Sequence, residues 1–188
     1  MRIGIFAGTF DPIHDGHIEV AKSAVKQLEL DQLYFMVEKD PWTKKQPVEV
    51  GHRIAMTTLA IQDEPSLLQF DAQQDRFTLT ETLQDIEQQF PNAELYFVFG
   101  ADVFLHMNTD TWPGLASLLE RHQIVVFERA QITEAEISQH ARSLGIVTAI
   151  IPSKHQHHAS KDVRMQPHHK NIWVPRAVAQ YIDENNLY

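Results

Sequence analysis

The chain alternates short apolar runs with longer segments in which apolar residues recur every three or four positions. The short runs are typical of buried parallel strands and occupy residues 2–6, 32–37, 66–70, 94–99, 123–127 and 146–151. Apolar residues at helical spacing predict amphipathic helices that open near residues 15–17 and cover residues 51–61, 77–86, 133–144 and 174–188. Strands that alternate with helices imply an α/β fold, a doubly wound parallel sheet in a single domain over residues 1–188.

Local signals refine some of these boundaries. Thr133, with Glu136 three residues later, predicts a capping box at a helix start, and Gly145 suits the end of that helix. Residues 38–50 contain two prolines and no sustained periodicity. We expect them to form a long loop that leaves the carboxyl end of the second strand, the edge at which open parallel sheets carry their ligand loops.

The first strand leads directly into a loop and a helix start. Gly8 ends the strand, and Thr9 adds a hydroxyl and a backbone N–H group beside it. Unpaired N–H groups at a helix N-terminus attract anions. His14 and His17 are three residues apart across Gly16, so both imidazoles can project from the first turn toward one bound group. This pattern predicts a phosphate-binding turn; the alternative is a junction whose histidines are merely exposed.

Composition narrows the classes of function. The formal charge of −9 argues against general nucleic-acid binding, which requires a basic face, although an anionic nucleotide can still bind through local positive groups. The absence of cysteine excludes a disulfide framework, a thiolate nucleophile and a cysteine-rich zinc site, and it suits a reducing cytoplasm. No apolar run approaches the roughly 18 residues of a membrane span. We therefore expect a cytoplasmic protein that binds neither nucleic acid nor membranes.

The string AGTFDPIHDGH, residues 7–17, is similar to the signature of the nucleotidyltransferases that carry a His-x-Gly-His motif. Its Gly-Thr-Phe-Asp-Pro opening most closely resembles the bacterial nicotinate-nucleotide adenylyltransferases. The resemblance implies a Rossmann-like fold of the nucleotidyltransferase type, with two catalytic histidines that contact the ATP triphosphate, His14 and His17. It also implies ATP and phosphate contacts at Gly8, Thr9, Phe10 and Gly16.

Gly100 and Asp102 follow the most strand-like run of the chain, residues 94–99. A carboxylate just past the carboxyl end of a central strand is well placed for a ribose hydroxyl or a magnesium-bound water. The alternative is that Asp102 is an N-terminal helix residue favoured by the helix dipole. The string FGAD, residues 99–102, again resembles the family, which implies that Gly100 and Asp102 contact ATP.

Two residues are predicted to contact the acceptor through their side chains. In the family a Trp at the place of Trp112 faces the pyridine ring of the mononucleotide, and stacking on a flat heterocycle suits it. Core packing is the alternative for this residue. Lys44, in the loop of residues 38–50, can turn its ammonium group toward a phosphate beside Trp42. The alternative is a solvated lysine next to a tryptophan that covers the core.

A third acceptor contact comes from the resemblance alone. Residues 81–83 match the acidic-Thr-Leu run of a family helix, which implies that Thr82 contacts the acceptor. The Tyr-Thr pair that opens this helix in the nicotinate enzymes is not reproduced at residues 77–79, where a shifted Thr78 or Thr80 is the substitute.

Two further segments resemble the family, so that the likeness runs from end to end. One is GHRIAM, residues 51–56, with Arg and Met at the family's spacing. Arg53 is therefore a candidate ligand contact, although an arginine in a first helical turn is usually a surface residue. The other is the closing helix, residues 174–188.

Residues 159–164, ASKDVR, occupy the place of the family's second motif, Ser-Ser-Thr-x-x-Arg. Ser160 and Arg164 match it, whereas Ala159 and Lys161 replace the first Ser and the Thr. We expect Ser160 to be the N-cap of a short helix that sets Arg164 one turn along on the same face. N–H groups at a helix start, a guanidinium and the added charge of Lys161 can hold the β- and γ-phosphates of ATP. Arg164 is the third predicted catalytic residue.

Five histidines flank this motif, at positions 155, 157, 158, 168 and 169. Their spacing matches neither a helical i, i+4 pair nor a compact three-ligand zinc site with a carboxylate. We therefore expect no protein-bound metal here, but a partly cationic flap over phosphates.

The leading hypothesis is adenylyl transfer from ATP to nicotinate mononucleotide, which yields the dinucleotide and pyrophosphate in NAD biosynthesis. Mg²⁺ is expected to bridge the phosphates and to be held mainly by them and by water. One alternative changes the acceptor to nicotinamide mononucleotide or another phosphorylated metabolite. Another is a non-catalytic nucleotide sensor, suggested by the altered second motif. The sequence argues against a P-loop hydrolase, because the Gly-x-x-x-x-Gly-Lys-Ser/Thr string of that class is absent.

Overall fold

The computed structural model describes residues 1–41, 46–72, 77–129, 131–153, 160–165 and 170–188. Within these segments one six-stranded sheet runs in the order β3-β2-β1-β4-β5-β6, and all neighbouring strands are parallel. The strands are β1 (Arg2–Gly8), β2 (Gln32–Val37), β3 (Leu67–Phe70), β4 (Glu94–Gly100), β5 (Gln123–Phe127) and β6 (Ala149–Ile151). This sheet confirms the predicted α/β, doubly wound class. Its strand order reverses at β1, and ligands of such sheets bind outside the carboxyl ends at that switch point.

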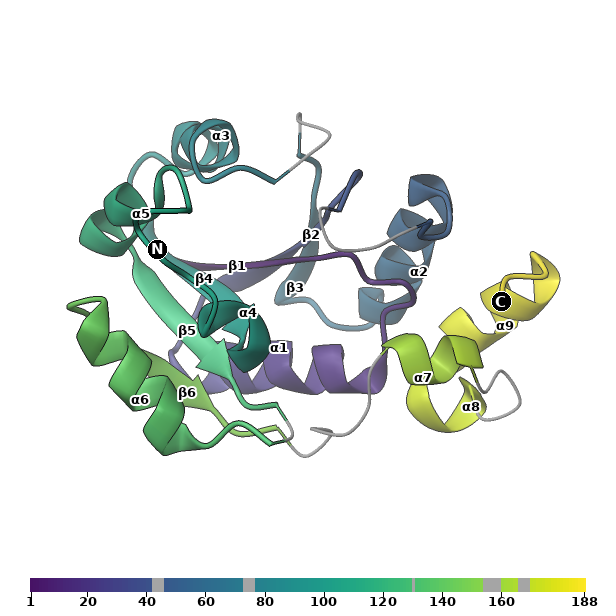
Figure 1. Ribbon diagram of the computed structural model, residues 1–188. Helices are drawn as coiled ribbons and strands as arrows, with labels where there is room; N and C mark the ends of the chain where they lie inside the picture. Colours follow the sequence, from purple (N-terminus) through teal and green to yellow (C-terminus); the bar gives the residue numbers. More distant parts are fainter. Residues whose placement is uncertain (42–45, 73–76, 130, 154–159, 166–169) are drawn as a thin grey trace.

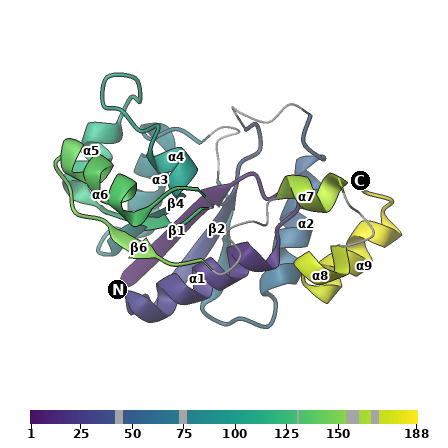
Figure 2. The ribbon, with the colours of Figure 1, turned by 60° about the horizontal axis from the view of Figure 1, so that its bottom comes forward.

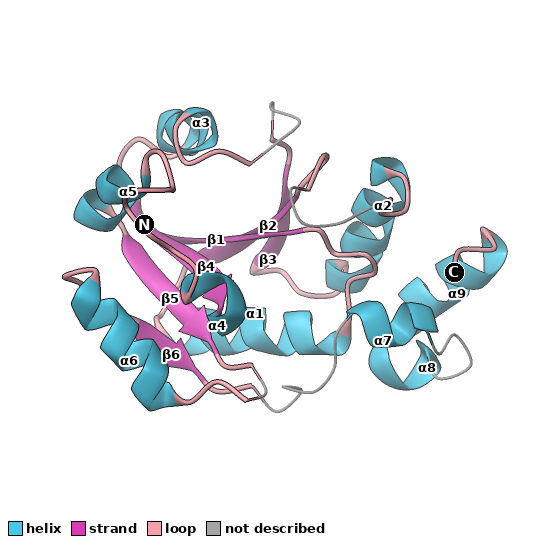
Figure 3. Cartoon of the chain, viewed as in Figure 1, coloured by secondary structure: helices cyan, strands magenta, loops and turns pink. Residues whose placement is uncertain are grey.

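Helices cover both faces of the sheet (Figures 1 and 3). The helices are α1 (Asp15–Gln27), α2 (Val50–Ile61), α3 (Glu81–Gln89), α4 (Ala101–Phe104), α5 (Leu115–Arg121), α6 (Glu134–Ser143), α7 (Ser160–Met165), α8 (Lys170–Trp173) and α9 (Arg176–Glu184). The core on one face takes side chains from α1, α2, α7 and α9, and the core on the other from α3, α4, α5 and α6. None of the helices in the described segments is long and apolar enough to span a membrane.

The central strands feed both cores because their side chains alternate between the faces. On β1, Ile5 points to the core of α3–α6, and the next residue, Phe6, points to the core of α1, α2, α7 and α9. On β4, Phe97 and Val98 divide in the same way, and Phe6 is the register partner of Val98. Burial on both faces explains why these strands are nearly continuous apolar runs in the sequence.

The strand predicted over residues 146–151 is shorter than expected, because Ile146 belongs to the turn that ends α6. Gly145, at φ +73°, donates its N–H to the Arg142 carbonyl at 3.1 Å, and the Ile146 N–H bonds to the Ala141 carbonyl at 3.0 Å. These two bonds are the Schellman motif that satisfies the last carbonyls of a helix. The end of α6 at Gly145 is confirmed, and β6 begins only at Ala149.

The helix predicted over residues 77–86 begins later, as α3, because threonines form a turn ahead of it. The Thr78 hydroxyl accepts a hydrogen bond from the Glu81 N–H at 3.1 Å, and the Thr78 N–H bonds to the Thr82 hydroxyl at 3.0 Å. Side chains thus take up backbone donors that have no partner within the helix.

Among the described residues, α5 and α8 were not expected from the sequence, whereas α4 agrees with the alternative in which Asp102 is an N-terminal helix residue. Helices α4 and α5 occupy the segment between the fourth and fifth strands, where residues such as Leu115 and Leu118 are buried one turn apart. At the other end, the expected helix over residues 174–188 is confined to α9, and α8 precedes it as a separate turn. Pro175 is the N-cap of α9, and a proline cannot continue a helix from the preceding turn.

Candidate functional site

The candidate site is built around the loop between β1 and α1, residues 9–14, called the catalytic loop below. It leaves the carboxyl end of β1 at the switch point of the sheet. The peptide bond between Asp11 and Pro12 is cis, and His14 is the N-cap of α1. The strand, turn and helix predicted at this junction are therefore confirmed, and the loop ends at the N-terminus of a 13-residue helix.

The two histidines of the motif lie together. The rings of His14 and His17 are stacked, with centroids 3.6 Å apart and planes inclined by 26°. The His14 backbone N–H donates to His17 Nδ1 at 3.2 Å. Since Nδ1 accepts this bond, a neutral His17 carries its proton on Nε2 and offers a donor there. The two residues are 1% and 8% exposed, so they are not the surface histidines of the alternative interpretation.

Two phenylalanine rings pack against His17. Phe10 adopts φ +47°, and its ring meets that of His17 edge-on at 5.1 Å; the Phe6 ring lies 5.9 Å from His17. A Cβ at position 8 would lie 2.9 Å from the Phe10 ring. The close approach of Phe10 therefore requires glycine at position 8. The Phe10 ring itself is buried and packs against His17.

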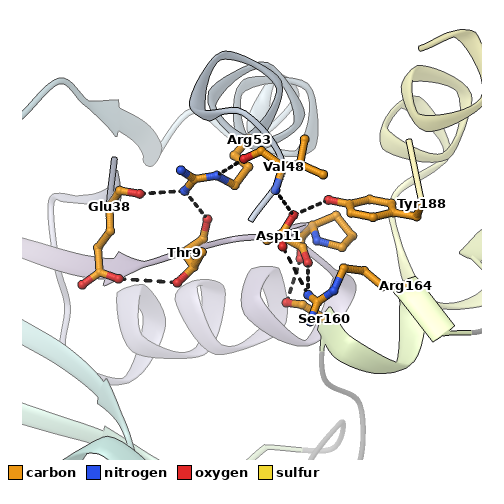
Figure 4. Close-up of polar contacts among 9 residues, drawn as sticks. Thr9, Asp11, Glu38, Val48, Arg53, Ser160, Arg164 and Tyr188 are labelled. Carbon is orange, nitrogen blue, oxygen red and sulfur yellow. Dashed lines mark hydrogen bonds and ion pairs between the residues drawn. The ribbon is translucent and has the colours of Figure 1, made fainter. Parts of the chain in front are cut away.

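Arg53, a candidate ligand contact with a surface position as the alternative, is buried, with 1% of the residue exposed. Its guanidinium donates to the carbonyls of Thr9 at 2.9 Å and Glu38 at 2.6 Å, and its Nε to the Val48 carbonyl at 2.8 Å (Figure 4). The guanidinium also donates to the Lys39 carbonyl at 2.9 Å. Burial lowers the pKa of Arg53, and the Asp11 carboxylate opposes that shift. The interpretation as a ligand contact is thus replaced by a positioning role, because the side chain ties the catalytic loop to the segment after β2.

Helix α7, which comes about 150 residues later in the sequence, lies beside the catalytic loop (Figure 2). The Ser160 hydroxyl donates to the Pro12 carbonyl at 2.9 Å, and the Arg164 guanidinium donates to the Asp11 carbonyl (Figure 4). Both residues therefore face the same loop, as their spacing predicts. The N-cap expectation for Ser160 is wrong: Ser160 is the first residue of α7, and its hydroxyl bonds to the loop instead of capping the helix.

The Asp11 carboxylate is buried and collects donors from three distant segments. Tyr188 donates its hydroxyl to Oδ1 at 2.6 Å, the Val48 N–H approaches the same oxygen at 3.4 Å, and Arg164 Nη1 lies 3.4 Å from Oδ2. Burial and the bond to Asp11 raise the pKa of Tyr188 above its ordinary value. Asp11 and Tyr188 were not foreseen, because the two residues are 177 positions apart and no local pattern links them.

Across the switch point, Gly100 ends β4 and Asp102 stands in the first turn of α4. The Asp102 side chain is 60% exposed, and its Oδ1 lies 3.7 Å from Nε of Arg129, which follows β5. The Arg129 guanidinium stacks on the Phe127 ring at 4.7 Å, and burial lowers its pKa. Asp102 therefore stays open to a ligand at the same sheet edge, beside an arginine that the sequence did not single out.

Two predicted acceptor contacts, Thr82 and Trp112, and the predicted phosphate contact Lys161 lie within the described residues. Thr82 is buried and its hydroxyl accepts the Thr78 N–H, so the structure gives it a role in starting α3. Trp112 is half-buried against the core of α3–α6, as its packing alternative expected. Lys161 is exposed on α7. Lys44 with Trp42, Ala159 and the five flanking histidines lie outside the described residues.

Gly16 is buried in the first turn of α1 and precedes His17 in the sequence. In the part of the chain that the structure describes, no three His, Asp or Glu side chains come together as a metal site.

Comparisons with known proteins agree with this geometry. The model of the cytidylyltransferase-like family matches residues 5–165. The probable nicotinate-nucleotide adenylyltransferase of Clostridium botulinum (strain Eklund 17B) is 33% identical over 199 residues, which covers 100% of this chain and 98% of the relative. That of Thermus thermophilus is 33% identical over 192 residues and covers 100% of both chains.

A solved structure has the same fold. The nicotinic acid mononucleotide adenylyltransferase of Plasmodium falciparum, in complex with NaAD, superposes with a TM-score of 0.82 and covers 100% of this chain and 97% of that one, at 18% identity. Because the family match includes both motifs and the relatives align over the full length, the chain belongs to the cytidylyltransferase-like family of nucleotidyltransferases, among the nicotinate-nucleotide adenylyltransferases.

Proposed function

We propose that this enzyme transfers the adenylyl group of ATP to the phosphate of nicotinate mononucleotide and releases pyrophosphate. The observation that carries the proposal is the stacked pair of His14 and His17 at the N-terminus of α1, in a chain whose relatives are named for this reaction. A helix N-terminus with paired imidazoles favours a polyphosphate because its N–H groups and the helix dipole attract anions.

The reaction requires no protein nucleophile. An oxygen of the acceptor phosphate forms a bond to the α-phosphorus, and the bond from that phosphorus to the oxygen bridging to the β-phosphate breaks. Pyrophosphate leaves with that electron pair. The chain's task is to align the two groups and to stabilise the charge of the transition state. In the proposal, Nε2–H of His17 donates to a phosphate oxygen, while His14 contacts the same triphosphate and Gly8, Thr9, Phe10 and Gly16 shape its cradle.

The second motif serves the leaving group. Arg164 and Ser160 already reach the catalytic loop, and the planar guanidinium has donors enough to contact both Asp11 and a pyrophosphate oxygen. Exposed Lys161 adds positive charge nearby. We propose that Gly100 and Asp102 bind the ATP ribose, and that Lys44, Thr82 and Trp112 contribute to the acceptor side.

Mg²⁺ fits this arrangement as a companion of the substrate phosphates. The exposed Asp102 carboxylate would hold the ion through water bound to it. The ion supplies charge neutralisation on the phosphates. We place the reaction in the cytoplasm, since the chain is free of cysteine and needs no oxidising compartment.

A panel of acceptors incubated with ATP and Mg²⁺, with pyrophosphate release as the readout, tests the proposal. Nicotinate mononucleotide is expected to give the highest kcat/KM, with nicotinamide mononucleotide and ribose 5-phosphate as comparisons. A preference for nicotinamide mononucleotide would reassign the acceptor. Saturable ATP binding with no pyrophosphate for any acceptor would indicate a nucleotide sensor and refute the transferase proposal.

A further inference from the structure

The segment after α9 is folded back by a specific turn. Asn186 adopts φ +51° and donates its N–H to the Asp183 carbonyl at 3.2 Å, and the Leu187 N–H bonds to the Ile182 carbonyl at 3.0 Å. These bonds form a Schellman motif with asparagine in the left-handed position, which asparagine tolerates better than most residues. The turn reverses the chain and delivers Tyr188 to the catalytic loop (Figure 4).

The contact that results is the shortest one at the Asp11 carboxylate among the described residues. Tyr188 Oη lies 2.6 Å from Oδ1, whereas the Val48 N–H and the Arg164 guanidinium approach the carboxylate only to 3.4 Å. A buried carboxylate is costly unless donors surround it. Asp11 therefore depends on Tyr188 for its strongest hydrogen bond.

We propose that Tyr188 is a positioning residue for catalysis, which holds Asp11 and with it the catalytic loop while Arg164 engages the leaving pyrophosphate. The inference rests on the proposed function, because it assigns Arg164 to the pyrophosphate. Arg164 Nη1 contacts Asp11, and its remaining N–H groups are the donors assigned to the pyrophosphate, so Arg164 has to serve the loop and the ligand together. Tyr188 keeps the Asp11 carboxylate hydrogen-bonded while Arg164 binds the pyrophosphate. Asp11 is three residues before His14, so this bond also holds the catalytic loop in position.

Tyr188→Phe removes only the hydroxyl and leaves the ring packed. We expect kcat to fall about tenfold, which is the loss typical of one hydrogen bond to a charged group, while KM for ATP changes less than about threefold. The matched control is Tyr181→Phe. It removes a hydroxyl from α9 that bonds to His52 Nδ1 at 2.9 Å and so ties α9 to α2 without touching the loop. This control is expected to keep kcat within about twofold of wild type.

A variant of the hydrogen-bond partner, Asp11→Asn, separates a positioning role of Tyr188 from a general effect on stability. In an Asp11→Asn background the neutral amide needs the tyrosine donor less, so adding Tyr188→Phe is expected to lower kcat by no more than about twofold. Equal kcat losses from Tyr188→Phe in both backgrounds, or equal losses from Tyr188→Phe and Tyr181→Phe, would overturn the positioning role.

A readout without activity keeps this inference distinct from the proposed reaction. Amide hydrogen exchange of peptides that cover residues 9–17 is expected to accelerate about fivefold in Tyr188→Phe and to stay unchanged in Tyr181→Phe. If wild-type protein releases no pyrophosphate, the transferase proposal fails while the exchange result still reports on the loop. Unchanged exchange in Tyr188→Phe would refute the contact's role whatever the activity.

Discussion

Arg53 is the largest of the fully buried side chains, and its charge is balanced mainly by the dipoles of carbonyl groups. Four carbonyl oxygens from three stretches of chain accept its hydrogen bonds. A buried guanidinium is costly unless acceptors surround it, and these four carbonyls meet that need. One residue thereby joins the catalytic loop, the end of β2 and the entrance to α2.

Replacing Arg53 with Met keeps the volume but removes all four bonds. We expect the free energy of unfolding to drop by about 3–5 kcal/mol, as for other buried charged groups that lose their network. Urea unfolding followed by circular dichroism measures this loss. Arg142→Met, at an exposed position on α6, is the control and should stay within about 0.5 kcal/mol of wild type. A loss below about 1 kcal/mol for Arg53→Met would show that water replaces the guanidinium.

His17 is expected to act mainly on the transition state. Its Nδ1 accepts the His14 N–H, so Nε2–H is the donor that a neutral ring presents to a phosphate. His17→Ala should lower kcat about 100- to 1,000-fold, the range for loss of one preorganised donor, and change ATP affinity only a few-fold. Steady-state kinetics together with calorimetric ATP binding separate the two effects.

His122→Ala is the matched control for that experiment. His122 bonds to Glu87 at 2.7 Å and stands just before β5, at the amino end of the sheet and away from the catalytic loop. It should leave kcat unchanged. Near-normal turnover of His17→Ala would refute the role assigned to this ring.

At the scale of elements, α6 is defined at both ends by local chemistry. The Thr133 hydroxyl accepts the Glu136 N–H at 3.3 Å, and the Glu136 carboxylate accepts the Thr133 N–H at 2.8 Å. Hydrogen bonds from Thr133, first from its hydroxyl and then from its N–H, lower the pKa of Glu136. The capping box predicted from the sequence is confirmed, and the Schellman turn at Gly145 closes the other end.

Thr133→Ala should reduce the free energy of unfolding by about 1 kcal/mol at neutral pH. A carboxylate with a lowered pKa stabilises the fold above its unfolded-state pKa, and the contribution disappears as pH falls through the folded value. The difference between wild type and Thr133→Ala should therefore shrink in acid. Unfolding curves at neutral and acidic pH measure it, with mid-helix Gln139→Ala as a control that should show no such pH dependence. A pH-independent difference would contradict a role for the carboxylate.

At the scale of the whole molecule, the loop after the first strand meets the C-terminal segments at the site. Helices α7 and α9 contribute to the core shared with α1 and α2, and residues from α7 and the segment after α9 bind the catalytic loop. Binding of ATP at the loop should therefore stabilise the molecule globally rather than one element. Because ligand binding stabilises the folded state, the shift in Tm measures ATP binding at the site.

ATP with Mg²⁺ at about 100 times its Kd should add about 2.7 kcal/mol to the free energy of unfolding, which corresponds to a rise in Tm of roughly 5–10 °C for a chain of this size. Differential scanning calorimetry measures the rise. Removing Mg²⁺ with a chelator should reduce it, and adenosine without phosphates should give little. An equal rise with adenosine would place the main binding energy outside the catalytic loop.

The sequence by itself determined those elements that are stabilised by residues close to one another in the chain. Strands β2 and β5 begin and end where their apolar runs do, because both faces of a parallel strand are buried. The capping residues of α6 and the glycine at its end act within a few positions of the helix they terminate. The pairing of His14 with His17 follows from one helical turn. For these features, neighbouring residues carry the physical cause.

Only the tertiary structure decided the contacts that join distant segments. Nothing near Arg53 in sequence indicates burial, since the carbonyls that hold it come from the ends of β1 and β2 and from the loop before α2. The bond between Asp11 and Tyr188 spans 177 positions and exists only where α9 and the catalytic loop are packed in the same fold. A buried charge is tolerable only where folding has gathered its partners, and that assembly is a property of the packed chain, not of any stretch of it.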